Sequence, residues 1–303
     1  MVLQPYLKLK YFTPPILEAA NRLVKILDGR ERSKEVRAKL SKEVAELRER
    51  GVVPTIALIH VGDLGGAAGY VRRKAEACAN IGIEAKVLSL PEQTSLDTLR
   101  SVIQSLNEDQ RVHGILLQLP LPQHIDEQKA LDLIPVEKDV DGSSSSSLGL
   151  LLAGKDGFVS AGALAALDLA KLAGFDFNGS TVHILGDSGI LGRPFAAIAL
   201  NLGAKVRLHP KDAASVPKDL CEADLLLVDV AKPKLIKGEH IKEGAVVIDA
   251  GNNYLDGKLV GDVDFEDACK KASAITPVPG GLGPMLITML MSNLIKAAKR
   301  LTQ

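Results

Sequence analysis

The sequence has little aromatic character, few cysteines and no excess of charge of either sign. Tryptophan is absent and aromatic residues make up 3% of the 303 residues, so a broad surface on which nucleic-acid bases stack is not expected. The 37 Lys and Arg residues balance 37 Asp and Glu residues. A chain without net charge has no long-range field that draws it to nucleic acid or anionic lipid. We therefore expect neither nucleic acid nor a membrane as a partner.

Cysteine usage and the N-terminal segment indicate where the protein works. Cys78, Cys221 and Cys269 are far apart and include no C-x-x-C pair, so neither a disulfide framework nor a structural zinc site is expected. The first residues, MVLQPYLKLKYFTPP, interrupt their apolar positions with lysines and prolines, unlike a secretory signal. No run approaches about 18 apolar residues without a charge, as a membrane span would require. A cytoplasmic protein without a bound metal is predicted.

The first half of the chain alternates helical and strand patterns. Residues 33–50 place apolar residues on one helical stripe, and 55–62 is a short apolar run that ends in glycine, typical of a buried strand. Strands that alternate with helices imply parallel pairing and right-handed crossovers. The predicted order is helix 33–50, strand 55–62, helix 69–80, strand 84–90, helix 95–109 and strand 112–120.

The second half repeats this alternation after a segment of different composition. Residues 142–163 are rich in Ser, Gly and Ala without a sustained period, which predicts a joint between domains. Its serines, Ser143 to Ser147, are expected to form a plain loop. The patterns beyond it predict strands 181–186, 205–210, 223–230 and 244–251 and a last helix, about 285–301, with Pro284 near its first position.

We therefore predict an α/β protein of two domains with parallel sheets. The N-terminal domain is expected to cover residues 1–150. The remainder, 151–284, is expected to form a Rossmann-like domain.

A glycine-spaced turn follows the first strand of the second half. Gly186, Gly189 and Gly192 form G-x-x-G-x-x-G instead of the dinucleotide fingerprint G-x-G-x-x-G. Glycines permit a tight turn and close approach, and the amides at the start of a helix can face a phosphate. The alternative is a turn needed only for packing of helix on strand. The predicted cofactor-binding residues are Gly186, Asp187, Ser188, Gly189, Gly192, His209 and Lys211.

The sequence leaves the choice between NADP and NAD open. The strand 205–210 leads to Arg207, His209 and Lys211 and carries no acid, which favours a 2′-phosphate and so NADP. Asp187, in the glycine turn, favours NAD instead.

Three segments of the first half carry side chains that suit catalysis. Tyr70 and Lys74 lie at i and i+4 of a predicted helix, on one face. The tyrosine ring could pack against a planar substrate, and the lysine ammonium could reach the reacting atom of that substrate. Gln118 ends one strand segment, and Asp139 and Asp141 end another. The carboxyl ends of parallel strands are where α/β proteins keep ligand groups. The alternatives are a solvated helix face and ordinary turns.

Together these segments resemble the bifunctional 5,10-methylenetetrahydrofolate dehydrogenase/5,10-methenyltetrahydrofolate cyclohydrolases, the FolD family. The similarity covers about residues 25 to 300, and the last of its motifs is specific to the family. The motifs occur in the family's order: YVRRK (70–74), QLPLP (118–122), KDVDG (138–142), GDVDF (261–265) and TPVPGGLGPM (276–285).

The resemblance implies a folate substrate, NADP or NAD as cofactor, and roles for individual residues. Lys74 would be the catalytic group, assisted by Tyr70, which packs on the aminobenzoyl ring of the folate, and by Gln118, which hydrogen-bonds the lysine. Asp141 would accept hydrogen bonds from the pterin. The N-terminal domain would be catalytic and joined by the C-terminal helix 285–303, and the domain 151–284 would bind NAD(P), with the catalytic cleft between them. The loop with Pro277, Gly280 and Gly281 would line this cleft, and the protein would form a homodimer through its nucleotide domains.

The chain departs from the family pattern mainly where relatives touch cofactor or substrate. The changes remove hydroxyls or a cation, while Tyr70, Lys74, Gln118 and Asp141 are retained. Asp187 replaces an arginine. Because a charge-assisted contact to a phosphate contributes about 1.5–3 kcal/mol to binding, this change should weaken the binding of NADP. The departures are Ala67 for serine, Ser160 to Ala163 for the PCTP segment, Asp187 for arginine, Pro210 for serine, Val230-Ala231 for Thr-Gly, and Leu286 for threonine.

Three hypotheses follow. The first is an active folate enzyme that oxidises 5,10-methylenetetrahydrofolate and hydrolyses 5,10-methenyltetrahydrofolate to 10-formyltetrahydrofolate with a modified cofactor site. The second is a non-catalytic member or engineered scaffold that has lost dinucleotide binding, and the third is a different Rossmann-type dehydrogenase. Residues 1–22 extend beyond the usual family start, and PPILEAANRL (14–23) could form a short surface helix.

Overall fold

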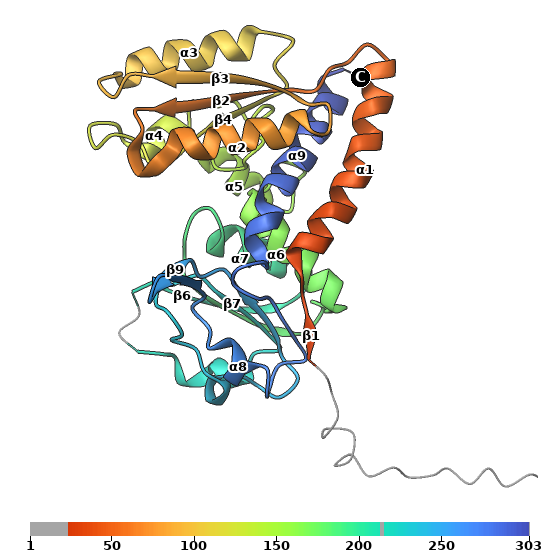
Figure 1. The fold of residues 1–303 in the computed structure, drawn as a ribbon, viewed down its shortest axis with the longest axis vertical. Coiled ribbons are helices and arrows are strands. Elements are labelled where there is room, and N and C mark those ends of the chain that lie inside the picture. Colours follow the sequence, from red (N-terminus) through yellow and green to blue (C-terminus); the bar gives the residue numbers. More distant parts are fainter. Residues whose placement is uncertain (1–23, 213–214, 303) are drawn as a thin grey trace, which may run out of the picture.

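Two parallel sheets, one above the other, are connected by two long helices (Figure 1). The computed structural model describes residues 24–212 and 215–302, so the PPILEAANRL segment lies outside the described residues. In the first half the elements are β1 (Lys25–Ile26), α1 (Gly29–Glu49), β2 (Thr55–Val61), η2 (Leu64–Gly66), α2 (Ala67–Ala79), β3 (Glu84–Leu90), α3 (Leu96–Glu108), β4 (Gly114–Leu117) and α4 (Glu127–Leu131).

The second half begins with two helices and continues with alternating strands and helices. Its elements are α5 (Ser145–Leu152), α6 (Ala161–Ala173), β5 (Thr181–Leu185), α7 (Gly192–Asn201), β6 (Lys205–His209), η3 (Lys218–Glu222), β7 (Leu225–Val228), η4 (Gly238–His240), β8 (Val246–Asp249), β9 (Asn253–Leu255), β10 (Lys258–Val260), α8 (Phe265–Ala268), β11 (Ala274–Ile275) and α9 (Leu282–Leu301).

The smaller sheet has the order β3-β2-β4 and is parallel throughout. Its middle strand, β2, is buried at every position, as expected for an uninterrupted apolar run covered on both faces. The larger sheet has the order β1-β11-β8-β7-β5-β6 and is also parallel. The predicted class of two α/β domains with parallel sheets is therefore confirmed. A separate antiparallel hairpin, β9 and β10, projects beside it.

Strand β1 belongs to the larger sheet although it lies near the N-terminus. Lys25 and Ile26 pair in parallel with Ala274 and Ile275 of β11. The division predicted at residue 150 places these residues in the N-terminal domain, so the structure corrects this detail. The sequence analysis missed this strand because two residues are too few to show an apolar periodicity. The strand can be recognised only from its pairing with β11.

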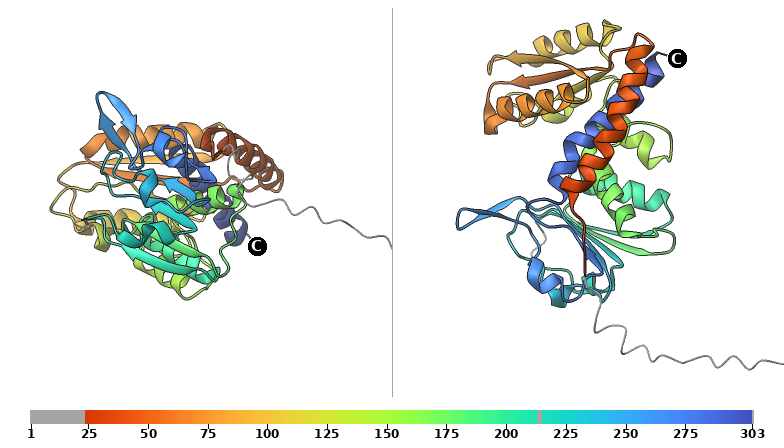
Figure 2. Two further views of the ribbon diagram at one scale, coloured as in Figure 1. Left: turned by 90° about the horizontal axis from the view of Figure 1, so that it is seen from below. Right: turned by 45° about the vertical axis from the view of Figure 1, so that its right-hand side comes forward.

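Helices α1 and α9 run side by side between the sheets (Figures 1 and 2). Ser33 of α1 and Thr288 of α9 share a buried hydrogen bond of 2.8 Å between their hydroxyls. At one end of the pair, Lys299 bonds Glu43 at 2.6 Å. The C-terminal helix thus packs on α1 of the first half and also on α6 of the second half.

The serine-rich joint is partly helical, contrary to the expected plain loop. Helix α5 begins after Ser144, whose hydroxyl accepts a hydrogen bond from the Ser147 amide. Ser147 in turn donates to Asp139 at 2.6 Å. Serines stabilise helix starts by accepting from amides in this way. Helix α9 also begins earlier than predicted, at Leu282, so that Pro284 is its third residue.

None of the helices in the described ranges has both the length and the apolar composition needed to cross a membrane.

The contact between α1 and the loop before α9 predicts a sensitive glycine. A Cβ on Gly29 would lie 1.8 Å from the carbonyl oxygen of Gly281. Since the clash is with backbone, Gly29→Ala should lower the free energy of unfolding by about 1–3 kcal/mol in urea denaturation. Gly149 of α5 has open space at its Cβ, so Gly149→Ala should be neutral or add about 0.5–1 kcal/mol. Equal stability of the two variants would contradict the prediction.

Candidate active site

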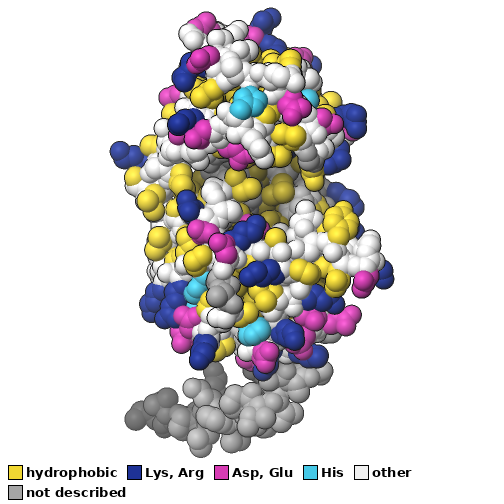
Figure 3. Space-filling view, turned by 90° about the vertical axis from the view of Figure 1, so that its left-hand side faces the viewer, with side chains coloured by type: hydrophobic (Ala, Val, Ile, Leu, Met, Phe, Trp, Pro, Cys, Tyr) yellow, Lys and Arg dark blue, Asp and Glu magenta, His cyan; other side chains and the backbone are white. Residues whose placement is uncertain are grey.

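A cavity of about 400 Å³ opens between the two halves of the molecule. Figure 3 shows a hollow midway along one face with hydrophobic side chains in its floor. Several of its residues directly follow strands, since Gln118 comes after β4, Asp229 after β7 and Ala250 after β8. The lining residues are Tyr70, Lys74, Leu116, Leu117, Gln118, Leu119, Asp141, Ser160, Ala161, Gly162, Ile190, Leu191, Asp229, Ala250, Leu282, Leu286 and Leu290.

Lys74 projects into this cavity from the middle of α2. Its Nζ donates to Oε1 of Gln118 at 2.9 Å, while Nε2 of Gln118 donates to the carbonyl of Leu119 at 2.6 Å. The second bond fixes which end of the amide faces the lysine. Burial lowers the pKa of Lys74, and the nearby Asp141 carboxylate partly offsets this effect. The ammonium is therefore held in one position and gives up its proton more readily than an exposed lysine.

The pKa of Asp141 shifts in the opposite direction to that of Lys74. Burial raises the pKa of its carboxyl to about 6. The charge of Lys74 opposes this rise, and the charge of Asp139 adds to it. Asp139 is itself buried and accepts from the Ser144 amide at 2.9 Å. The serine segment thus fixes the loop that carries Asp141.

Tyr70 lies one helical turn before Lys74, at the cavity. Its side chain is 48% exposed, and the guanidinium of Arg73 lies 4.4 Å from the centre of its ring. A cation over an aromatic face is attracted by the ring's quadrupole. The structure therefore brings together four predicted site residues, Tyr70, Lys74, Gln118 and Asp141, around one cavity.

The glycine turn lies between β5 and α7 and reaches the same cavity through Ile190 and Leu191. Gly186 has a φ of 107°, and a Cβ there would lie 2.1 Å from the carbonyl oxygen of Asp229. A Cβ on Gly192 would lie 1.8 Å from the Gly186 oxygen, whereas Gly189 faces open space. Gly186 and Gly192 are thus required for the turn to pack. No side chain caps α7 at Leu191.

The polar residues of the turn are held by neighbouring groups. Ser188 donates to Asp229 at 3.1 Å and accepts from the Gly192 amide at 3.3 Å. Asp187 pairs with Arg193 at 3.2 Å and accepts from the Lys211 amide at 3.3 Å. The Lys211 amide bond and Arg193 lower the pKa of Asp187.

His209 ends β6 and faces another histidine. Its Nε2 is 3.4 Å from Nδ1 of His183. Burial lowers the pKa of both rings. The predicted cofactor residues therefore lie around the carboxyl ends of β5 and β6.

The loop before α9 is placed differently from the other predicted residues. Pro277, Gly280 and Gly281 are not among the residues that line the cavity, although Leu282, the next residue, is. Gly280 accepts a hydrogen bond from the Gly29 amide at 2.8 Å. The loop thus packs against the start of α1, and its role in substrate binding stays a prediction.

Asp229 is a site residue that the sequence reasoning did not single out. It lines the cavity, accepts from Ser188 of the turn, and has a pKa raised by burial. Its position directly after the apolar strand β7 was the available signal, because ligand groups gather at carboxyl ends of strands. His183 was also missed, since an isolated histidine in an apolar strand belongs to no motif.

Two family profiles match the chain. The catalytic domain of tetrahydrofolate dehydrogenase/cyclohydrolase matches residues 27–141, and the NAD(P)-binding domain of the same enzymes matches residues 160–302. Together they cover more than half of the sequence.

Similar proteins agree with this match over nearly their whole length. The bifunctional protein FolD of Listeria innocua is 43% identical over 277 residues, which is 91% of this chain and 98% of that protein. The crystal structure of the bifunctional FolD enzyme of Campylobacter jejuni has a TM-score of 0.87 at 41% identity and covers 91% of this chain and 99% of that one. The Trypanosoma brucei enzyme, complexed with NADP cofactor and inhibitor, has a TM-score of 0.85 at 34% identity and covers 92% and 99%.

The raised pKa of Asp141 predicts a cost to stability. A carboxyl whose pKa rises from 3.8 to about 6 on folding binds its proton more tightly in the folded protein, so it reduces stability as the pH rises from about 4 to 6. Asp141→Asn should therefore raise the free energy of unfolding by about 1–2 kcal/mol at pH 8, with a smaller gain at pH 5, in urea denaturation at both pH values.

Asp156 provides the opposite case, because its bonds to Lys296 and Arg300 lower its pKa. Asp156→Asn should give no gain at pH 8. A loss of stability in Asp141→Asn at pH 8 would contradict the prediction.

Proposed function

The chain belongs to the tetrahydrofolate dehydrogenase/cyclohydrolase family, and from this we propose that it interconverts one-carbon units on tetrahydrofolate with a nicotinamide dinucleotide as cofactor. It would oxidise 5,10-methylenetetrahydrofolate and hydrolyse 5,10-methenyltetrahydrofolate to 10-formyltetrahydrofolate. The family membership excludes the unrelated Rossmann dehydrogenase considered above.

One observation carries this proposal. The Lys74 ammonium is hydrogen-bonded to Gln118 in a cavity that residues of both halves of the chain line. A non-catalytic scaffold would not need to keep a partly desolvated lysine there, since burying a cation costs free energy.

The lowered pKa of Lys74 suits it to proton transfer. In hydrolysis, a water must lose a proton as it attacks the one-carbon bridge of the methenyl substrate. A lysine whose pKa is lowered by burial can exchange that proton near neutral pH better than an exposed one. Gln118 keeps the amine aimed at the bridge, and Tyr70 supplies a ring surface for the planar substrate.

Asp141 is assigned to the polar head of the folate. Its carboxyl lies at the cavity and, at a pH above its pKa of about 6, is mostly ionised. An ionised carboxylate accepts hydrogen bonds from ring N–H and amino groups, and these charge-assisted bonds are strong in a partly dry site. Binding of the pterin would thus position the bridge near Lys74.

The turn after β5 fits a dinucleotide. Its glycines let the backbone fold closely against Asp229, so a pyrophosphate can approach the turn backbone, although the first two amides of α7 already donate to Ser188. A bound dinucleotide would supply an acceptor for the hydride that leaves the substrate carbon. Ile190, Leu191 and Ala250 would exclude water from that side of the cavity.

The surroundings of Asp187 favour NAD over NADP. Asp187 accepts from the Lys211 amide, so its carboxylate lies beside the end of β6, where the adenosine ribose is expected. Arg207, which suggested a 2′-phosphate, is instead engaged by Asp219 and by Glu222 at 3.2 Å. An acid there accepts hydrogen bonds from a ribose diol and repels a phosphate.

The cytoplasmic location and the homodimer remain predictions.

The lysine assignment is tested by Lys74→Met. Methionine keeps the apolar stem and removes the amine, so the rate of methenyltetrahydrofolate hydrolysis should fall by at least about a hundredfold in a stopped-flow absorbance assay. Dinucleotide affinity should stay unchanged. Lys39→Met, on the exposed face of α1, is the matched control and should keep full activity. Equal hydrolysis rates in Lys74→Met and the wild type would refute the proposal.

The cofactor preference is tested by Asp187→Ser. Removing the carboxylate should raise NADP affinity by about tenfold to a hundredfold and lower NAD affinity, as measured by fluorescence titration. Asp176, near the opposite end of β5, offers a control in Asp176→Ser, which should change neither affinity. Tighter binding of NADP than of NAD by the wild type would overturn the preference.

A further inference from the structure

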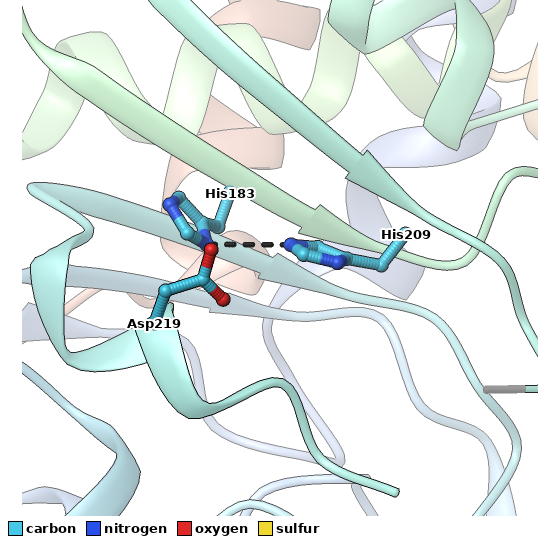
Figure 4. A group of neighbouring side chains, drawn as sticks. All are labelled: His183, His209 and Asp219. Atoms are coloured by element: carbon cyan, nitrogen blue, oxygen red, sulfur yellow. Dashed lines mark hydrogen bonds between the residues drawn. The ribbon is translucent and has the colours of Figure 1, made fainter. Parts of the chain in front are cut away.

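Two histidines and an aspartate meet on one face of the larger sheet (Figure 4). His183 comes from the middle of β5, His209 from the end of the neighbouring strand β6, and Asp219 from η3. One nitrogen of each ring and one carboxylate oxygen all lie within 4.8 Å of one another. None of the three lines the cavity that holds Lys74.

The spacing of the two imidazoles suits a single metal ion. Nδ1 of His183 and Nε2 of His209 are 3.4 Å apart and face each other. Two Zn–N bonds of about 2.0–2.1 Å at a tetrahedral angle place their nitrogens roughly 3.3–3.4 Å apart. The rings are therefore already at the separation that a shared ion requires.

The burial of His183 is not explained by packing. The residue is 0% exposed, and within the described chain its Nε2 has no hydrogen-bond partner. Leaving a buried polar group unsatisfied costs free energy, and an aliphatic residue such as its neighbours Val182 and Ile184 would avoid this cost. The feature that distinguishes His183 from an aliphatic side chain is its other nitrogen, which faces His209 and Asp219.

Asp219 can bind a metal ion without leaving its present partner, Arg207, unpaired. It is hydrogen-bonded to Arg207, which also lies 3.2 Å from Glu222. The Asp219 side chain is 34% exposed and that of Arg207 49%, so their ion pair is weak. Arg207 can stay paired with Glu222, and the exposed side of Asp219 gives an ion a path from solvent.

We propose that His183, His209 and Asp219 form a binding site for a divalent transition metal of the zinc class. Two imidazole nitrogens and one carboxylate oxygen are donors typical of zinc, whereas magnesium and calcium select oxygen ligands. The fourth position would be open to water. This inference does not depend on the proposed folate chemistry, and it gives His209, predicted from the sequence to bind the cofactor, a metal-binding role. It differs from the sequence-based expectation of no metal, which rested on cysteine spacing.

The test is a titration of the full-length, chelator-treated protein with zinc chloride by calorimetry. The wild type should bind one equivalent. His183→Leu and Asp219→Asn should each weaken this binding by more than about tenfold. His240→Gln, which changes a histidine beside Glu239 in the same half, should bind as the wild type does, and so should Cys221→Ser, which removes the exposed thiol of η3.

Thermal denaturation without metal shows that each variant is folded. Asp219 is partly exposed, so Asp219→Asn tests the site even if His183→Leu is poorly folded. The proposal is overturned if the wild type binds no zinc, if either His183→Leu or folded Asp219→Asn binds as the wild type does, or if zinc binding requires Cys221 or His240.

Discussion

The Lys74 ammonium is partly removed from bulk water and donates to the amide oxygen of Gln118, and the surrounding structure keeps it there. Such a group is stable only where polar atoms replace its lost water. Gln118 supplies one such atom, and Asp141 supplies a compensating charge. The amide of Gln118 is in turn oriented by the next carbonyl along the chain. The pKa of the lysine is lowered and that of the acid is raised, so the lysine gives up a proton more readily than an exposed lysine does.

The cavity exists because the two sheets are held apart by a rigid pair of helices. Helices α1 and α9 cross from one sheet to the other and pack against each other, with buried hydroxyls and apolar residues between them. Asn293 of α9 donates to the carbonyls of Val140 and Val159, both at 2.8 Å. This amide links the loop that carries Asp141 to the segment that enters the second half, so the same helix pair positions groups from both sides of the cavity.

Much of this arrangement could be predicted from the sequence, because the strands are short apolar runs that end at polar or glycine residues. Helical spacing and the rule that carboxyl ends of strands carry ligand groups singled out Lys74 and Gln118, but their proposed roles came from the resemblance to the FolD family. Helix α5 could not be predicted from apolar periodicity, since its first turn depends on serines that bond Asp139. Asp229 was missed although its place directly after β7 was a signal. His183 lies within an otherwise apolar strand, and only the fold shows what its side chain faces.

Strand β1 has a consequence for how the chain reaches its native state. Lys25 and Ile26 hydrogen-bond to a strand at the far end of the sequence, so a ribosome-bound chain cannot complete the larger sheet until almost all of it has been synthesised. Closing so large a loop carries an entropic cost that is met before the contact stabilises anything, and non-local pairing of this kind slows folding. Once the pairing has formed, β1 covers the outer edge of β11 and so protects that edge from pairing with a strand of another chain.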